Sequence, residues 1–198
     1  MPLKFPKNIE LISNELTLAA DVSVYSPKNG LAEMSLLANI TDGDAKFAEH
    51  YYPHLLMGDD LVGYLNRAIV DGKISQAKVL FNGPLANFPF EDNSGIFVVD
   101  AELTDSKFTF DNDWSAIHDF NGNLNFTNNS MLITGRSGTL DGLDVTGVVA
   151  EIAELSGEQV LTVSAEIKNT APLLVTQLMN NSPLADSVGK VLQQVVIS

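Results

Sequence analysis

The sequence predicts a mainly β protein with short helices, an α+β chain built on an antiparallel, strongly twisted sheet. Three observations support this fold class. Apolar and polar residues alternate through most of residues 74–167, which is the pattern of half-buried strands. Turn signals interrupt this alternation at residues 92–95, at Asn121–Gly122 and at Asp141–Gly142. Segments 35–65 and 162–192 also align without a gap, each as an apolar strand followed by two short amphipathic helices, which indicates a repeat.

The first 72 residues predict a few strands followed by two helices. Residues 16–25 are expected to form a hairpin that ends at the Asn29–Gly30 turn signal, and residues 34–40 a strand that residues 42–44 interrupt. Helical segments are expected at 45–52 and from Asp59, a suitable N-cap, to Asp71–Gly72. One face of the second helix would carry the apolar residues Leu61, Tyr64, Leu65, Ala68 and Ile69.

The remaining residues predict a meander and a second pair of helices. Expected strands are 74–81, 95–103, 107–110, 120–126, 131–134, 143–152 and 160–167. Thr170 can cap a helix that carries Leu174 and Leu178 on one side, and Ser182–Pro183 opens another. We therefore expect residues 1–72 to end one repeat, 73–168 to form the antiparallel meander, and 169–198 to supply a helical pair and the first strand of the next repeat.

The predicted strands have one apolar and one polar face. Phe120, Leu124 and Phe126 alternate with asparagines, and Val163 alternates with hydroxyl residues. Such a sheet must cover its apolar face by closing on itself, by packing on a second sheet, or by holding an apolar ligand. The alternative is that the phenylalanines form an ordinary protein core.

Composition excludes several classes of function. The net charge of −14 argues against binding to nucleic acid or to an anionic membrane surface, and the absence of cysteine excludes disulfides and thiol catalysis. His50 and His54 lack the glutamate of a zinc-protease helix, and Asp111 and Asp113 lack the rest of a calcium loop. We therefore expect no enzymatic activity, no cofactor and no metal site.

Several segments taken together resemble the large AsmA-like proteins of Gram-negative bacteria. The resemblance rests on YPHLLMGDDLVGYL at 52–65, PLANFPF at 84–90, NSGIF at 93–97, Asp113–Trp114, Asn125–Phe126 and SPLADS at 182–187. It implies a repeat from a larger periplasmic β-groove protein that is anchored in the inner membrane and reaches toward the outer membrane. Parts outside this chain would make both membrane contacts, and both ends of the chain are interpreted as cuts that could let copies associate artificially.

The resemblance also implies a function, which is the carriage of phospholipids between the two membranes with their acyl chains on the apolar groove. The structural alternative is a scaffolding envelope protein with a closed core and no bound lipid. The helical residues Leu61, Tyr64, Leu65, Ala68, Ile69, Leu174 and Leu178 are expected to cover the sheet. The candidate groove lining is Phe81, Phe97, Val99, Phe108, Phe110, Phe120, Leu124, Phe126, Met131, Ile133, Val145 and Val163.

Overall fold

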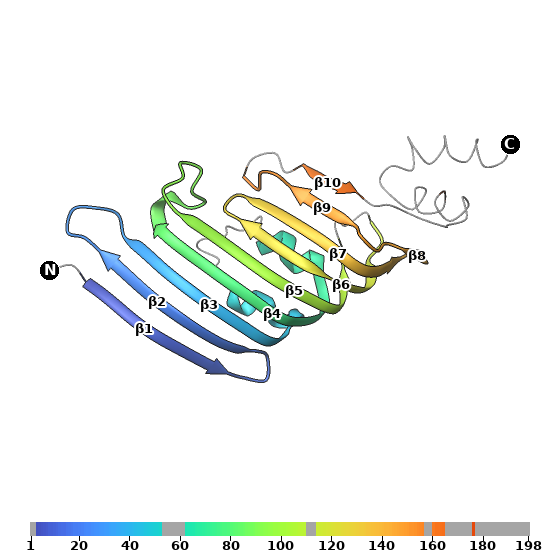
Figure 1. Ribbon diagram of the computed structural model, residues 1–198, viewed down its shortest axis with the longest axis horizontal. Coiled ribbons are helices and arrows are strands. Elements are labelled where there is room, and N and C mark those ends of the chain that lie inside the picture. The colour runs from blue at the N-terminus through green and yellow to red at the C-terminus, as the bar shows by residue number, and fades with distance from the viewer. Residues whose placement is uncertain (1–2, 53–61, 110–113, 157–159, 165–175, 177–198) are drawn as a thin grey trace.

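The described part of the chain forms one antiparallel sheet in which each strand lies beside the next (Figure 1). This computed structural model describes residues 3–52, 62–109, 114–156, 160–164 and 176. The strand order is β1-β2-β3-β4-β5-β6-β7-β9-β10, and the short β8 pairs with β7. The strands are β1 (Leu3–Ile12), β2 (Thr17–Ser26), β3 (Glu33–Asp44), β4 (Ile69–Pro84), β5 (Ile96–Phe108), β6 (Ile117–Thr127), β7 (Ser130–Leu140), β8 (Leu143–Asp144), β9 (Val149–Ile152) and β10 (Leu161–Ser164). The predicted fold class, an open antiparallel meander with short helices, is confirmed.

The strand register gathers the apolar side chains on one face of the sheet, called the inner face below. Residues that are paired across neighbouring strands point to the same side, so each run of pairs forms a row. Three rows cross the inner face, and from β2 onward every residue in them is apolar; on β1 they continue at Lys7, Ile9 and Leu11. They are Val22–Leu36–Phe81–Phe97, then Ala20–Ala38–Val79–Val99–Phe126–Met131–Ile152–Leu161, and Leu18–Ile40–Ala77–Ala101–Leu124–Ile133–Ala150–Val163.

The opposite, outer face carries polar side chains that bond to one another. Its central row pairs Lys78 with Asp100, and Asp100 with Asn125. The Asn123 amide donates to Asp100 at 3.1 Å and to Glu102 at 3.1 Å. Since these groups are hydrated or paired, this face can remain in water without a cover.

A helical segment between β3 and β4 packs on the inner face. It contains the 3₁₀ helix η1 (Ala45–Tyr51) and a helix at 62–68, and Figure 1 shows both on one side of the sheet. The Asp44 side chain accepts from the Lys46 amide and so begins η1. Leu65 and Ala68 are buried in the same apolar core as the inner-face residues. The helix therefore covers part of the sheet, as its apolar stripe predicts.

Several strands are longer than their local sequence patterns predict. Residues 16–25 do not form a hairpin, because most of them belong to the single strand β2, which pairs with β1. The expected strands 95–103 and 107–110 lie largely in one strand, β5, whose register is irregular between Leu103 and Ser106. The expected strand 143–152 is divided into β8 and β9.

Two of the predicted breaks lie inside strands. Asn121–Gly122 is in the middle of β6, and Asp71–Gly72 is near the start of β4. Ile69 is consequently the first residue of β4 and not part of the helix, although it is buried in the core as expected. Gly72 has a φ of +130° and lies against Ser106, so this irregular part of the β4–β5 pair requires a residue without a side chain.

The predicted division into repeats stays a prediction. Of the second aligned segment, 162–192, only residues 162–164 and 176 are described. The described strands pair continuously from β1 to β10, and β4 extends across the expected boundary between residues 72 and 73.

Candidate functional site

The inner face is the candidate functional site, and its β4–β9 part is closely packed. Phe108, Phe120 and Ile133 have no measurable exposure. The other predicted lining residues that are buried there are Phe81, Phe97, Leu124, Phe126, Met131 and Val145. Val99 is half-buried, Val163 is 39% exposed, and Phe110 lies outside the described residues. The structure therefore brings the predicted side chains together, most of them as part of one protein core.

The inner face is more open over β1, β2 and β3. Ile9 and Leu11 are each 38% exposed, and the inner-face residues of β2 and β3 are mostly half-buried. The half-buried set is Leu18, Val22, Val24, Met34, Leu36 and Ile40. The sequence analysis did not include these residues in the lining. The alternation of apolar and polar residues over 18–24 is the sequence signal for this face. It predicts one continuous strand, whereas the expected hairpin divided residues 16–25 into two.

Three of the residues predicted to cover the sheet lie in the described helix at 62–68. Leu65 is 3% exposed and Ala68 is 1% exposed, while Tyr64 is half-buried against the same core. Leu61, Leu174 and Leu178 lie outside the described residues.

A second cover comes from the loop that joins β4 to β5. Its 3₁₀ helix η2 (Leu85–Asn87) is followed by Phe88 and Phe90, whose rings contact inner-face phenylalanines. The ring centroids of Phe88 and Phe97 are 5.3 Å apart, and those of Phe90 and Phe81 are 5.1 Å apart. Residues 84–90 contribute to the family resemblance, but no local pattern in them predicts that they fold back on the sheet.

Ionisable groups lie at the borders of this site. Burial, assisted by the nearby Glu49 carboxylate, raises the pKa of Tyr52 to about 12, and its ring packs against the core. Hydrogen bonds from Ser94 and then from Asn87 lower the pKa of Asp92 in the β4–β5 loop. Between β2 and β10 none of the three inner-face rows contains an ionisable residue, so this part of the face offers contacts to apolar groups; on β1 the first row continues at Lys7, which pairs with Val22.

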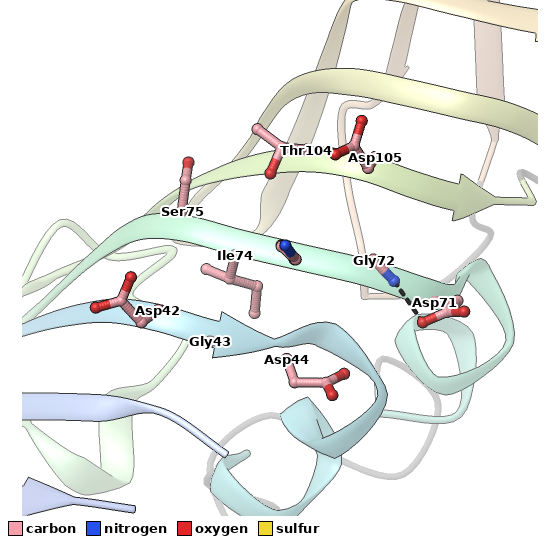
Figure 2. A pocket seen from close by; sticks show the side chains of 10 residues that line it. Asp42, Gly43, Asp44, Asp71, Gly72, Ile74, Ser75, Thr104 and Asp105 are labelled. Carbon is pink, nitrogen blue, oxygen red and sulfur yellow. Dashed lines mark hydrogen bonds between the residues drawn. The ribbon is translucent and has the colours of Figure 1, made fainter. Parts of the chain in front are cut away.

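A separate acidic hollow lies where β3, β4 and β5 come together near the helical segment (Figure 2). It has a volume of about 530 Å³ and is lined by Asp42, Asp44, Asp71 and Asp105, with Lys73 among them. Figure 2 shows these carboxylates spread around the hollow, and Asp71 accepts a hydrogen bond from the Gly72 amide at 2.8 Å. Across the described residues, no group of three or more His, Cys, Asp or Glu side chains is placed to hold a metal ion.

Of the other polar residues considered from sequence, His50 is described and has a structural contact. His50 Nδ1 lies 3.3 Å from Glu15, whose carboxylate also accepts a hydrogen bond from the Tyr51 hydroxyl. His54, Asp111 and Asp113 lie outside the described residues. None of the helices in the described ranges is long and apolar enough to cross a membrane.

Comparisons with known proteins identify related sequences. The model of a protein family described as YhdP protein matches residues 6–198. The intermembrane phospholipid transporter YhdP of Escherichia coli strain K12 is 31% identical over 188 residues. That match covers 95% of this chain but 15% of the relative, so the chain corresponds to a small part of the relative's length. No solved structure matches.

Proposed function

Because the chain belongs to the YhdP protein family, we propose that it is a segment of a phospholipid-transport protein whose inner sheet face holds acyl chains. The observation that carries this proposal is the continuous apolar inner face from β2 to β10, where the three rows contain no charged residue. The name of the E. coli relative supplies the class of ligand.

The physical chemistry of the face suits a diacyl lipid. Removing each CH₂ group of an acyl chain from water is favourable by about 0.8 kcal/mol, and the inner-face side chains offer apolar contacts of the required kind. A charged headgroup would remain in solvent, since the inner-face rows offer it no ionic partner between β2 and β10. Contacts that depend on apolar area and not on a specific polar group also let a lipid move on to the next segment.

The inner-face residues have two roles in this proposal. The half-buried residues of β2 and β3 offer the accessible surface, and Val99 and Val163 extend it toward β10. The deeply buried phenylalanines of β4–β6 form its packed support in the described arrangement. In the full-length protein we place this face in the periplasm. Other parts of the protein would anchor it in the inner membrane and reach toward the outer membrane.

The alternative is a scaffold with a closed core that holds no lipid. It requires the apolar face to be fully covered by protein. The half-buried residues of β2 and β3 favour the lipid-holding function over this alternative.

Neighbouring leucines on opposite faces test the proposal. Leu36 belongs to the inner face, where it pairs with Phe81, and Leu37 pairs with Leu80 on the outer face and is 51% exposed. The photo-reactive p-azidophenylalanine is placed at each position of the full-length protein in cells, and lipid adducts are detected by mass spectrometry. Adducts at position 36 and none at position 37 support the proposal, whereas stronger labelling at the more exposed position 37 contradicts it.

A further inference from the structure

Residues 85–95, the loop between β4 and β5, are called the strap below. We propose that the strap is a releasable cover, which keeps acyl chains off the inner face of β4 and β5 while Glu91 holds it closed. This inference rests on the proposed function, because it concerns where on the inner face a lipid can lie.

The underside of the strap is aromatic. The Phe88 ring lies 5.3 Å from Phe97 and 6.1 Å from Phe81, measured between centroids, and the Phe90 ring lies 5.1 Å from Phe81. Phe81 and Phe90 are each 1% exposed. The strap therefore occupies the apolar surface of β4 and β5 that an acyl chain would otherwise contact.

Two glycines, Gly83 near the end of β4 and Gly95 at the end of the strap, let the Phe90 ring lie this close to the sheet. A Cβ atom at Gly83 would lie 2.9 Å from Cε1 of Phe90, and a Cβ atom at Gly95 would lie 2.7 Å from the Asn82 carbonyl oxygen and against the same ring. Such approaches leave no room for a methyl group. The end of β4 and the residue before β5 are thus shaped to receive the Phe90 ring.

Glu91, in the middle of the strap, makes polar contacts with residues beyond β5. Glu91 Oε1 accepts from Ser156 Oγ at 3.0 Å and from the Asn129 amide at 3.3 Å. Asn129 lies in the β6–β7 turn and Ser156 follows β9, and the Ser156 amide donates to Asn129 Oδ1 at 2.9 Å. The carboxylate of Glu91 thus connects the strap to two segments beyond β5.

These contacts differ in strength from those beneath the strap. All three hydrogen bonds are exposed, so water competes for each donor and acceptor. The aromatic contacts exchange one apolar partner for another when an acyl chain takes the place of the Phe88 ring, which costs little in hydration. Release at Glu91 followed by replacement of Phe88 is therefore a physically reasonable route by which lipid reaches Phe97.

Photo-crosslinking in the full-length protein tests the proposal. The probe p-azidophenylalanine replaces Phe97 under the strap, or Leu36 outside it as the reference position. Each probe is combined with Glu91→Ala, which removes the acceptor, with Glu91→Gln, which keeps an acceptor oxygen, or with Glu154→Ala, which removes an exposed acid elsewhere. The yield of phospholipid adduct is measured by mass spectrometry.

We expect a lower yield at position 97 than at position 36 in the parent protein. Glu91→Ala should raise the yield at position 97 by about two- to tenfold, the factor that corresponds to the loss of an ordinary hydrogen bond. Glu91→Gln and Glu154→Ala should leave it low. The strap proposal is overturned if the adduct yield at position 97 equals that at position 36 in the parent protein. It is also overturned if Glu91→Ala leaves the yield at position 97 unchanged.

The reference position separates the two proposals. If lipid adducts form at position 36 but Glu91→Ala does not change the yield at position 97, the strap proposal is refuted and the proposed function stands. No adducts at either position refute both. Hydrogen exchange gives an independent reading, because the Phe90 and Asn93 amides bond within the strap and should exchange faster in Glu91→Ala only if Glu91 holds the strap closed.

Discussion

Replacing Gly122 with alanine tests the packing at the centre of the inner face. Gly122 lies in β6, and the Phe120 ring folds over it. A Cβ atom at this position would contact the Phe120 ring and would lie 2.6 Å from the backbone oxygen of Thr134. Phe120 has no measurable exposure, so its ring cannot turn into solvent.

The expected cost follows from this crowding. Forcing one extra carbon into a packed core costs about 1–3 kcal/mol, more than a strand gains when alanine replaces glycine. For a chain of this size the melting temperature should fall by roughly 2–12 °C, since each kcal/mol shifts it by about 2–4 °C. Thermal unfolding of the 198-residue chain followed by circular dichroism measures the change.

A second glycine supplies the matched control. Gly63 lies in the helix at 62–68, where a Cβ atom would approach only the flexible end of Arg67 at 3.3 Å. Gly63→Ala should therefore stabilise the chain by about 0.5–1 kcal/mol. The reasoning is refuted if Gly122→Ala also stabilises the chain, or if Phe120→Leu, which shortens the crowding side chain, does nothing to reduce the cost of Gly122→Ala.

Three further predictions concern the core, the helix cover and the strap. Phe108→Ala should cost about 3–5 kcal/mol in denaturant unfolding and Val163→Ala about 1 kcal/mol or less, because Phe108 is fully buried and Val163 is 39% exposed; equal losses would contradict the assigned core. Leu65→Asp should cost at least about 3 kcal/mol while Asn66→Asp at the exposed neighbouring position changes stability little, and an unchanged melting temperature for Leu65→Asp would refute the helix cover. Because the folded-state pKa of Asp92 is below its ordinary value of 3.8, its stabilising effect on the strap is complete above that value and is lost as the pH falls through the lower folded-state pKa. The Ser94 amide donates to Asp92, so in the parent chain its hydrogen exchange should become faster, relative to that of the sheet amides, as the pH falls through this pKa. The Asp92→Asn chain should show no such pH-dependent increase.

The sequence predicted the fold class because strand alternation is a local property. Phe120, Leu124 and Phe126 alternate with asparagines, and the structure places all three on the inner face. Alternation does not decide between Phe97 with Val99 and Ile96 with Val98, because all four are apolar; the structure pairs Phe97 with Phe81 and so places Phe97 and Val99 on the inner face. The structure resolves this ambiguity because the pairing partner of each residue on β4 and β6 identifies its face.

The local errors arise where distant residues decide the role of a glycine or a strand. Asn121–Gly122 has the composition of a turn, but in the structure position 122 requires a glycine because the Phe120 ring lies over it and leaves no room for a Cβ atom. The strand β1 was missed because Pro6 and Asn8 interrupt its apolar pattern, which an edge strand tolerates. Nothing local in residues 85–95 indicates that Phe88 and Phe90 return to the sheet, since their partners Phe81 and Phe97 are specified by tertiary packing.

The most direct test of the central claim is the lipid content of the purified chain. Organic extracts of the 198-residue chain, expressed with export to the periplasm, are analysed by mass spectrometry alongside Leu36→Asp and Leu37→Asp, which place the same charge on the inner and the outer face. The account predicts co-purified phospholipid in the parent chain and in Leu37→Asp, and its loss from a folded Leu36→Asp chain. Phospholipid retained in Leu36→Asp and lost from Leu37→Asp would contradict the claim that the inner face holds the acyl chains.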